Sequence, residues 1–136
     1  MITYSRAKDF DETQLAELFK SVGWVSGNYP EKLKTAMQNS TRVVSAWFGN
    51  KLVGLGRGMD DGAWQATIDC LLVTPEFQRQ GIASALINTL LEEYRNFLYI
   101  NVTPEEKENV TFYQKFGFEV EGCGTLMQIK GKELLL

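Results

Sequence analysis

The chain has 136 residues, of which 44% are hydrophobic, and a net charge of −3 from 14 basic and 17 acidic side chains. This length fits one domain with a sizeable core, so we expect a single domain over residues 1–136. The mildly acidic balance argues against a nucleic-acid binder that neutralises phosphates, and it suits a cationic small substrate better. The sequence contains no histidine, which excludes imidazole-based triads and histidine-ligated zinc.

The cysteines and the apolar segments exclude further classes of protein. Cys70 and Cys123 lie far apart and lack the spacing of a disulfide framework or a zinc site, so we expect no metal. The first residues lack a basic start followed by an apolar run, and no window approaches the roughly 18 apolar residues of a membrane span. The sequence therefore predicts a cytoplasmic protein that does not enter a membrane.

The first forty residues predict a strand and two helices. Residues 2–7 alternate weakly and favour a strand. Asp11, with Gln14 three residues later, resembles a capping box that opens a helix, and Gly23 ends that helix. Pro30 suits the first position of a short second helix that ends before Asn39 and Ser40.

The middle of the chain predicts an antiparallel meander. Arg42–Phe48 and Lys51–Met59 are expected strands joined by a turn at residues 49 and 50. Asp60 and Asp61 are expected turn formers before a third strand, residues 63–73.

The pattern then changes to a helical one. Apolar residues at helical spacing predict a helix from Ile82 to about Arg95, followed by a strand over residues 97–102 and hence a right-handed parallel crossover. Residues 105–116 are expected to form another helix. Phe118–Val120 and Thr125–Ile129 are expected to form a closing antiparallel pair.

The junction at residues 73–86 is the most informative part of the chain. It indicates a strand that runs into a glycine-containing turn and then into an amphipathic helix. The first amides of a helix have no intrahelical acceptor, and the helix dipole places positive charge there, so residues 79–84 offer N–H donors to an anion. Gly81 and Ala83 would leave the backbone bare enough for a pyrophosphate to approach closely.

Two motifs identify a family resemblance. Val73 and Pro75 precede a Gln-x-x-Gly-x-Ala run that starts at Gln78, and an Asn-x-x-x-Tyr-x-x-x-Gly-Phe run starts at Asn109. Together these runs resemble the GNAT superfamily of acetyl-CoA-dependent N-acetyltransferases, over roughly residues 43–120. The resemblance implies an α/β fold: a mixed, mostly antiparallel sheet flanked by helices, with acetyl-CoA entering where one parallel strand pair splays apart.

The resemblance also implies a set of cofactor-binding residues. The backbone of Leu71, Leu72 and Val73 would run beside the pantetheine arm, and Asn109 would belong to a second cofactor motif. The residues expected to hold the pyrophosphate are Gln78, Arg79, Gln80, Gly81, Ile82, Ala83 and Ser84. Many members have glycine where this chain has Ala83. For Arg79, a charge-assisted contact to phosphate and a solvated surface position both stay open.

Two residues are candidates for acid–base chemistry. The resemblance places Tyr113, four residues after Asn109 and hence on the same helical face, beside the cofactor sulfur, whereas the alternative is an aromatic residue at the rim of the core. Proton transfer from a tyrosine to a thiolate is uphill by roughly 2 kcal/mol at ordinary pKa values, so hydrogen bonding to the departing sulfur suffices. Asp69 is the best general base, acting directly or through water; alternatively it bonds to neighbouring backbone.

The expected acceptor is the primary amine of a small molecule. Residues 18–34 loosely resemble the plastid and cyanobacterial serotonin N-acetyltransferase branch, which suggests an arylalkylamine. A protein or peptide amine, and a non-catalytic acyl-CoA-binding regulatory module, are the alternatives, and a homodimer is left open. Trp24, Tyr29, Trp47 and Trp64 are candidates either for an acceptor pocket or for core filling.

Overall fold

The computed structural model describes residues 1–135, and its coordinates form two compact units, Met1–Thr103 and Pro104–Leu136. Among the described residues, no helix has the length and apolar character needed to cross a membrane.

The first unit is built on a five-stranded sheet whose strands lie in chain order. The first three pairs of neighbouring strands are antiparallel, and the last pair is parallel. The strands are β1 (Ile2–Ser5), β2 (Arg42–Phe48), β3 (Lys51–Asp60), β4 (Gln65–Val73) and β5 (Tyr99–Val102). This arrangement confirms the predicted mixed, mostly antiparallel sheet.

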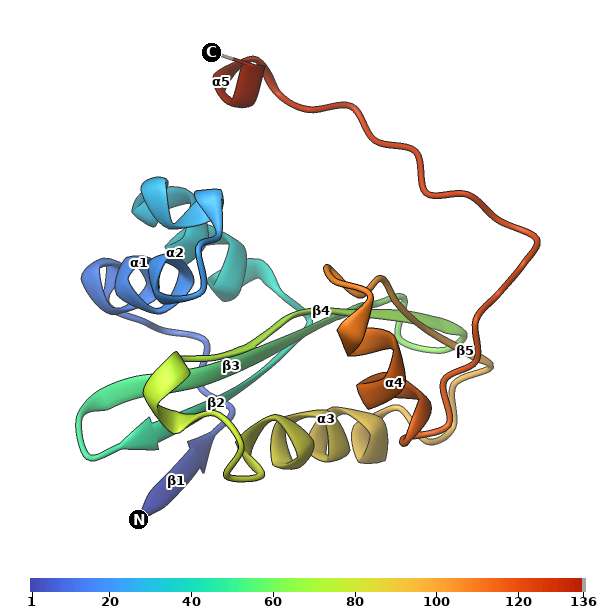
Figure 1. Cartoon of the computed structure of the whole chain (residues 1–136), viewed down its shortest axis with the longest axis horizontal. Coiled ribbons are helices and arrows are strands. Elements are labelled where there is room, and N and C mark those ends of the chain that lie inside the picture. The colour runs from blue at the N-terminus through green and yellow to red at the C-terminus, as the bar shows by residue number, and fades with distance from the viewer. Residues whose placement is uncertain (136) are drawn as a thin grey trace. The chain divides into compact units, whose positions relative to one another are not determined.

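Helices cover both faces of this sheet. Figure 1 shows α1 (Glu12–Ser21) and α2 (Pro30–Asn39) on one face and α3 (Ile82–Glu93) on the other. A 3₁₀ turn, η1 (Val25–Asn28), connects α1 to α2. The side chain of Asp11 caps α1 by accepting from the N–H of Thr13, and Pro30 opens α2. Both predicted helix starts are confirmed.

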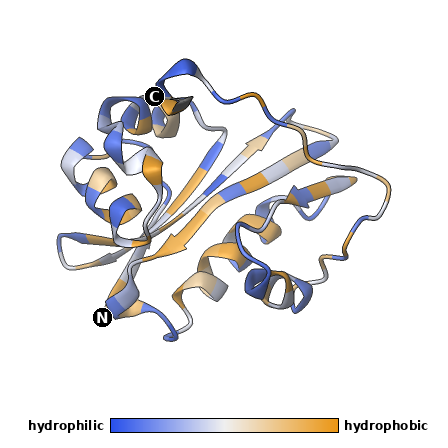
Figure 2. Cartoon of the chain, turned by 45° about the horizontal axis from the view of Figure 1, so that its top comes forward, coloured by the Kyte–Doolittle hydropathy of each residue, from blue (hydrophilic) through white to orange (hydrophobic). Residues whose placement is uncertain are grey.

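Each face of the sheet packs in a different way. On the α1 and α2 side, Leu15, Phe19 and Met37 are fully buried against Val43 and Leu55. Figure 2 shows apolar residues gathered along the central strands.

On the α3 side, β3 carries glycines where the helix approaches. A Cβ atom on Gly54 would lie 3.2 Å from side-chain atoms of Ile82 and Leu86, and one on Gly58 would lie 2.2 Å from the hydroxyl of Tyr94. The glycines of β3 therefore permit close packing of α3 on the sheet.

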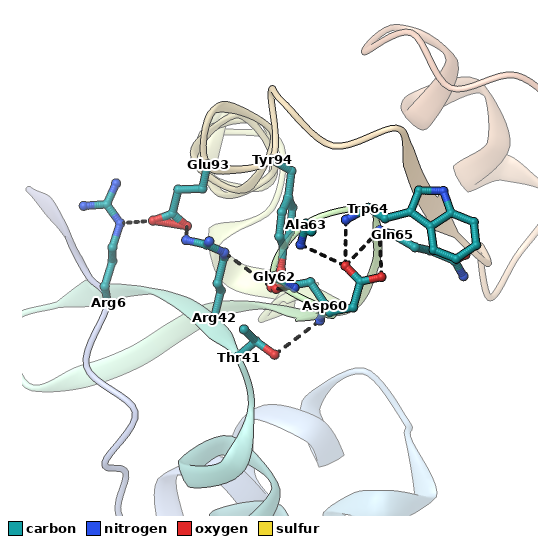
Figure 3. A network of polar contacts seen from close by, with 11 residues as sticks. Arg6, Thr41, Arg42, Asp60, Gly62, Ala63, Trp64, Gln65, Glu93 and Tyr94 are labelled. Atoms are coloured by element: carbon teal, nitrogen blue, oxygen red, sulfur yellow. Dashed lines mark hydrogen bonds and ion pairs between the residues drawn. The ribbon is translucent and has the colours of Figure 1, made fainter.

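A buried polar network fixes the C-terminal end of α3 (Figure 3). The Tyr94 hydroxyl donates to Oδ2 of Asp60 at 2.8 Å, and Arg42 Nε lies 3.4 Å from the same oxygen. Glu93 pairs with Arg6 at 2.6 Å and with Arg42 at 3.8 Å. Because the Asp60 side chain is only 1% exposed, its carboxylate relies on these partners, and not on water, for stabilisation of its charge.

Asp60 and Asp61 also form the predicted turn. Asp60 Oδ1 accepts from the N–H of Gly62, and Asp61 Oδ1 accepts from the N–H groups of Ala63, Trp64 and Gln65. Asp60 thus serves both the turn and the network.

Some element boundaries differ from those expected. Phe97 donates its N–H to the carbonyl of Tyr94 at 2.9 Å and packs its ring against that tyrosine. Because Phe97 belongs to the turn after α3, β5 begins only at Tyr99.

The second unit contains α4 (Glu108–Gln114) and the short α5 (Lys132–Leu135). The predicted pairing of Phe118–Val120 with Thr125–Ile129 is wrong, because residues 118–131 contain no strand. The side chains of Val120, Leu126 and Ile129 are 74%, 70% and 98% exposed. Two short strands that cover no apolar layer gain too little free energy from burial to form an isolated hairpin.

Candidate functional site

Strand β4 has a free edge at its C-terminal end. Its parallel pairing with β5 covers Gln65–Ile68 only, so Leu71–Val73 have no strand partner on that side among the described residues. On the other side, the register with β3 shifts between Leu55 and Arg57. At this bulge Cys70 takes a φ of +52°. Bulges re-aim the backbone next to functional sites.

The predicted pantetheine-contacting residues lie in this stretch. Leu71 is partly exposed, whereas the side chains of Leu72 and Val73 are buried. Val73 pairs with Gly54 of β3. The free edge of β4 can therefore offer backbone groups to an extended ligand, as a further strand would receive them.

A tight loop connects β4 to α3. The side-chain amide of Gln78 donates to the carbonyl of Val73 at 2.9 Å, and the N–H of Phe77 donates to the carbonyl of Thr74 at 2.9 Å. Arg79 has a φ of +64° and Gly81 a φ of +83°. Sequence reasoning assigned Gln78 only to the ligand and missed that its side chain closes the loop.

The start of α3 is open to an anion. Gly81 is the N-cap and supplies no side-chain cap, and the first intrahelical N–H bond runs from Ala85 to the Gly81 carbonyl at 3.1 Å. The amides of Ile82, Ala83 and Ser84 therefore have no intrahelical acceptor. A Cβ on Gly81 would meet no heavy atom within 4 Å, so the approach is clear. The residues present fit a pyrophosphate bound by backbone amides.

Asp69 has a partner that the sequence reasoning missed. Arg57 Nε donates to its Oδ1 and Arg57 Nη2 to its Oδ2, both at 2.7 Å. This hydrogen bonding raises the pKa of the Arg57 guanidinium. The two residues are register partners across β3 and β4. Counting strand positions in both directions from the predicted turn at residues 60–62 could have shown that Arg57 and Asp69 lie opposite each other.

In the second unit, Asn109 and Tyr113 both lie on α4, as predicted. Asn109 is exposed. Tyr113 is 8% exposed, and its ring lies 5.2 Å from that of Phe112 and 5.7 Å from that of Phe118.

Two of the candidate acceptor-pocket tryptophans fill the core. Trp24 packs edge-on against Phe19 at 5.8 Å, and Trp47 stacks on Phe10 at 6.3 Å. Both are partly buried against the α1 and α2 core. Trp64 is 52% exposed and contacts Tyr99.

The family model described as acetyltransferase (GNAT) family matches residues 9–118. The chain belongs to the GNAT family. It is therefore an acetyl-CoA-dependent N-acetyltransferase, and the match covers both the β4–α3 junction and α4.

Curated relatives agree with this family assignment. An uncharacterised N-acetyltransferase ycf52 of Pyropia yezoensis is 33% identical over 122 residues, which are 86% of this chain and 70% of that protein. The chloroplastic GCN5-related N-acetyltransferase 2 of Arabidopsis thaliana is 31% identical over 90% of this chain and 55% of its own length.

Solved structures agree with the fold. A GNAT family acetyltransferase from Streptococcus pneumoniae is 30% identical with a TM-score of 0.81, over 96% of this GNAT chain and 98% of its own. A probable acetyltransferase from Staphylococcus aureus has a TM-score of 0.87 at 20% identity.

Proposed function

We propose that this GNAT enzyme transfers the acetyl group of acetyl-CoA to the primary amine of a small molecule, by direct attack in a ternary complex. One observation carries the proposal. The free edge of β4 at Leu71–Val73 leads through one loop to the uncapped start of α3. Pantetheine would lie along Leu71–Val73, and the pyrophosphate would bind at residues 78–84.

The reaction needs one bond formed and one broken. The neutral amine attacks the thioester carbon, and backbone amides near Leu72 and Val73 polarise the carbonyl oxygen. The carbon–sulfur bond then breaks, and Tyr113 donates a hydrogen bond to the departing thiolate. This role for Tyr113, and cofactor contact by Asn109, rest on the family resemblance.

We propose that Asp69 removes the amine proton through a bound water. A carboxylate offers about four acceptor positions, and Arg57 occupies two of them. The remaining positions can hold a water that passes the proton on. This route uses no histidine, which the chain lacks.

Direct transfer agrees with the surroundings of Cys70. Its side chain packs against the α1 and α2 core, as a small apolar residue does. A thiol nucleophile needs a sulfur atom that the thioester can reach. We therefore expect no acetyl-enzyme.

A protein or peptide acceptor is the second candidate. The histone acetyltransferase TAP1 of Glycine max is 33% identical over 90% of this chain and 58% of its own length. The net charge of −3 suits either a small cation or a lysine-rich peptide. An arylalkylamine acceptor, a cytoplasmic location and a homodimer stay predictions.

Thiol release from acetyl-CoA separates these candidates. The panel contains arylalkylamines, polyamines, aminoglycosides and lysine peptides, and we expect a small amine to give the highest kcat/KM. A preference for peptides would favour the second candidate. Silence across the panel with tight acetyl-CoA binding would instead indicate a non-catalytic module. Intersecting initial-velocity lines are expected for the ternary complex, whereas parallel lines would contradict it.

A further inference from the structure

The tip of the β2–β3 hairpin contacts the loop that leads to α3. Phe48 and Lys51 are the last register pair of this hairpin, so their side chains share one face. The ring centroid of Phe48 lies 5.2 Å from that of Phe77. Lys51 Nζ lies 5.9 Å from the Phe77 centroid and forms an ion pair with Glu76. The hairpin tip therefore holds the loop through an aromatic contact and a charge contact.

The loop has a conformation that needs such support. Arg79 has a φ of +64°, in the left-handed region that is unfavourable for a non-glycine residue. Bonds from Thr74 N–H to the Val53 carbonyl and from Gln78 to the Val73 carbonyl fix where the loop leaves β4. Beyond that point, Phe77 packs against Phe48, and Glu76 pairs with Lys51.

We propose that Phe48 is a positioning residue for acetyl-CoA. By packing on Phe77, it keeps residues 74–80 in the conformation that presents the amides of Ile82–Ser84 to the pyrophosphate. The inference rests on the proposed pyrophosphate site, which begins at Gln78. It adds to that site Phe48 on β2, which lies 30 positions earlier in the chain.

This role is separable from folding. Phe48 is 49% exposed, so its ring contributes less to the core than a buried aromatic does. A cavity of about 630 Å³ lies between α1 and the hairpin tip, and Phe48, Lys51 and Thr74 line it. Because the tip borders this cavity, truncating Phe48 removes no closely packed core side chain.

The test combines amide hydrogen exchange with calorimetric titration of acetyl-CoA, which needs no acceptor amine. In Phe48→Ala we expect faster exchange in residues 74–80, unchanged exchange around Leu90, and an acetyl-CoA Kd raised about 3- to 10-fold, because an aromatic pair contributes about 0.5–1.5 kcal/mol. Phe48→Tyr keeps the ring and should restore both values. Tyr4→Ala, which truncates an aromatic residue that is 46% exposed on β1, is the matched control.

A double-mutant cycle shows whether Phe48 acts through Phe77. Phe77→Ala should raise the Kd like Phe48→Ala, and the double variant should raise it no further. Phe48→Leu is measured in parallel, so the test does not depend on the alanine variant folding. Unchanged loop exchange or unchanged affinity in both Phe48 variants would overturn the inference. Normal acetyl-CoA binding by Gly81→Glu would instead overturn the pyrophosphate site itself.

Discussion

The hydroxyl of Tyr94, at the end of α3, donates to Oδ2 of Asp60, at the end of β3, with 2.8 Å between the two oxygens. This bond places a carboxylate that is almost fully buried beside the ring of a tyrosine that is itself fully buried. Arg42 lies over the same ring, 5.1 Å from its centroid. The pair thus couples the helix to the sheet through a charge that water does not reach.

Tyr94→Phe should destabilise the protein, and the effect should depend on pH. Removing the hydroxyl leaves a buried carboxylate with one donor fewer, which costs about 1–3 kcal/mol at neutral pH. Burial first, and then the hydrogen bond to Asp60, raise the pKa of Tyr94 above its ordinary value of 10. The tyrosine therefore ionises in the unfolded chain before it ionises in the folded one.

The sign of the pH effect follows from that order. The stabilisation by Tyr94 is complete below pH 10 and declines above it, by about 1.4 kcal/mol for each pH unit. Urea unfolding between about pH 8 and 11 should show the wild type losing its advantage over Tyr94→Phe. A constant difference between the two proteins over this range would contradict the assignment.

Gly58→Ala should destabilise the same region. The new Cβ would lie 2.2 Å from the Tyr94 hydroxyl, so the ring must move away from Asp60. Overpacking of this kind costs about 1–3 kcal/mol, measurable by urea unfolding. Gly122→Ala, where a Cβ meets no heavy atom within 4 Å, is the control and should change the free energy of unfolding little.

Gly81→Glu should abolish acetyl-CoA binding, because it adds bulk and negative charge where the pyrophosphate is proposed to bind. Gly62→Glu is the matched control. Both glycines have a φ of +83° and open space around the missing Cβ, so both variants should carry a similar backbone strain of about 1–2 kcal/mol. In calorimetric titrations only the Gly81 variant should lose binding. Equal loss in both variants would point to general destabilisation.

Tyr113→Phe should lower kcat by about 10- to 1000-fold, the range for losing one acid or electrostatic contributor. The ring and its packing against Phe112 and Phe118 remain, so acetyl-CoA affinity should change little. Tyr4→Phe removes an exposed hydroxyl elsewhere and should keep full activity. A Tyr113→Phe enzyme with normal kcat would reduce Tyr113 to a core aromatic.

Cys70→Ala should stay active, because the proposed transfer forms no acetyl-enzyme. Alanine and cysteine face the same backbone demand at a φ of +52°, so the substitution tests the thiol alone. Mass spectrometry after incubation with acetyl-CoA should find Cys70 unmodified. An acetylated Cys70, together with an inactive alanine variant, would establish a covalent route.

The sequence predicted the β4–α3 junction better than the polar contacts of the fold. The turn at Gly81 and the helix after it depend on residues that are close in sequence, so local sequence patterns were sufficient to predict both elements. The Arg57–Asp69 pair depends on the register of β3 and β4, which can be predicted only if the position of the turn between them is known to the residue. The Tyr94–Asp60 bond joins residues 34 positions apart, and apolar periodicity alone represented Tyr94 as one more core side chain.

The predicted closing pair of strands shows the opposite limit. Residues 125–129 have a strand-like composition, but β propensity depends on the surface that a strand packs against. Thr125 to Ile129 are exposed in the structure, so the second unit supplies no such surface. Composition alone therefore overestimated the strand content of the second unit.

The two ends of helix α3 are held in different ways. The network of Asp60, Arg42 and Glu93 secures its last turn, while its first turn has no capping side chain. Ligand-induced ordering should therefore be concentrated in the first turn, and the melting temperature should report occupancy of that turn. At a free acetyl-CoA concentration of 100 times Kd, mass action adds about 2.7 kcal/mol to the free energy of unfolding, which makes a thermal-shift titration a direct assay for donor analogues before any acceptor amine is known.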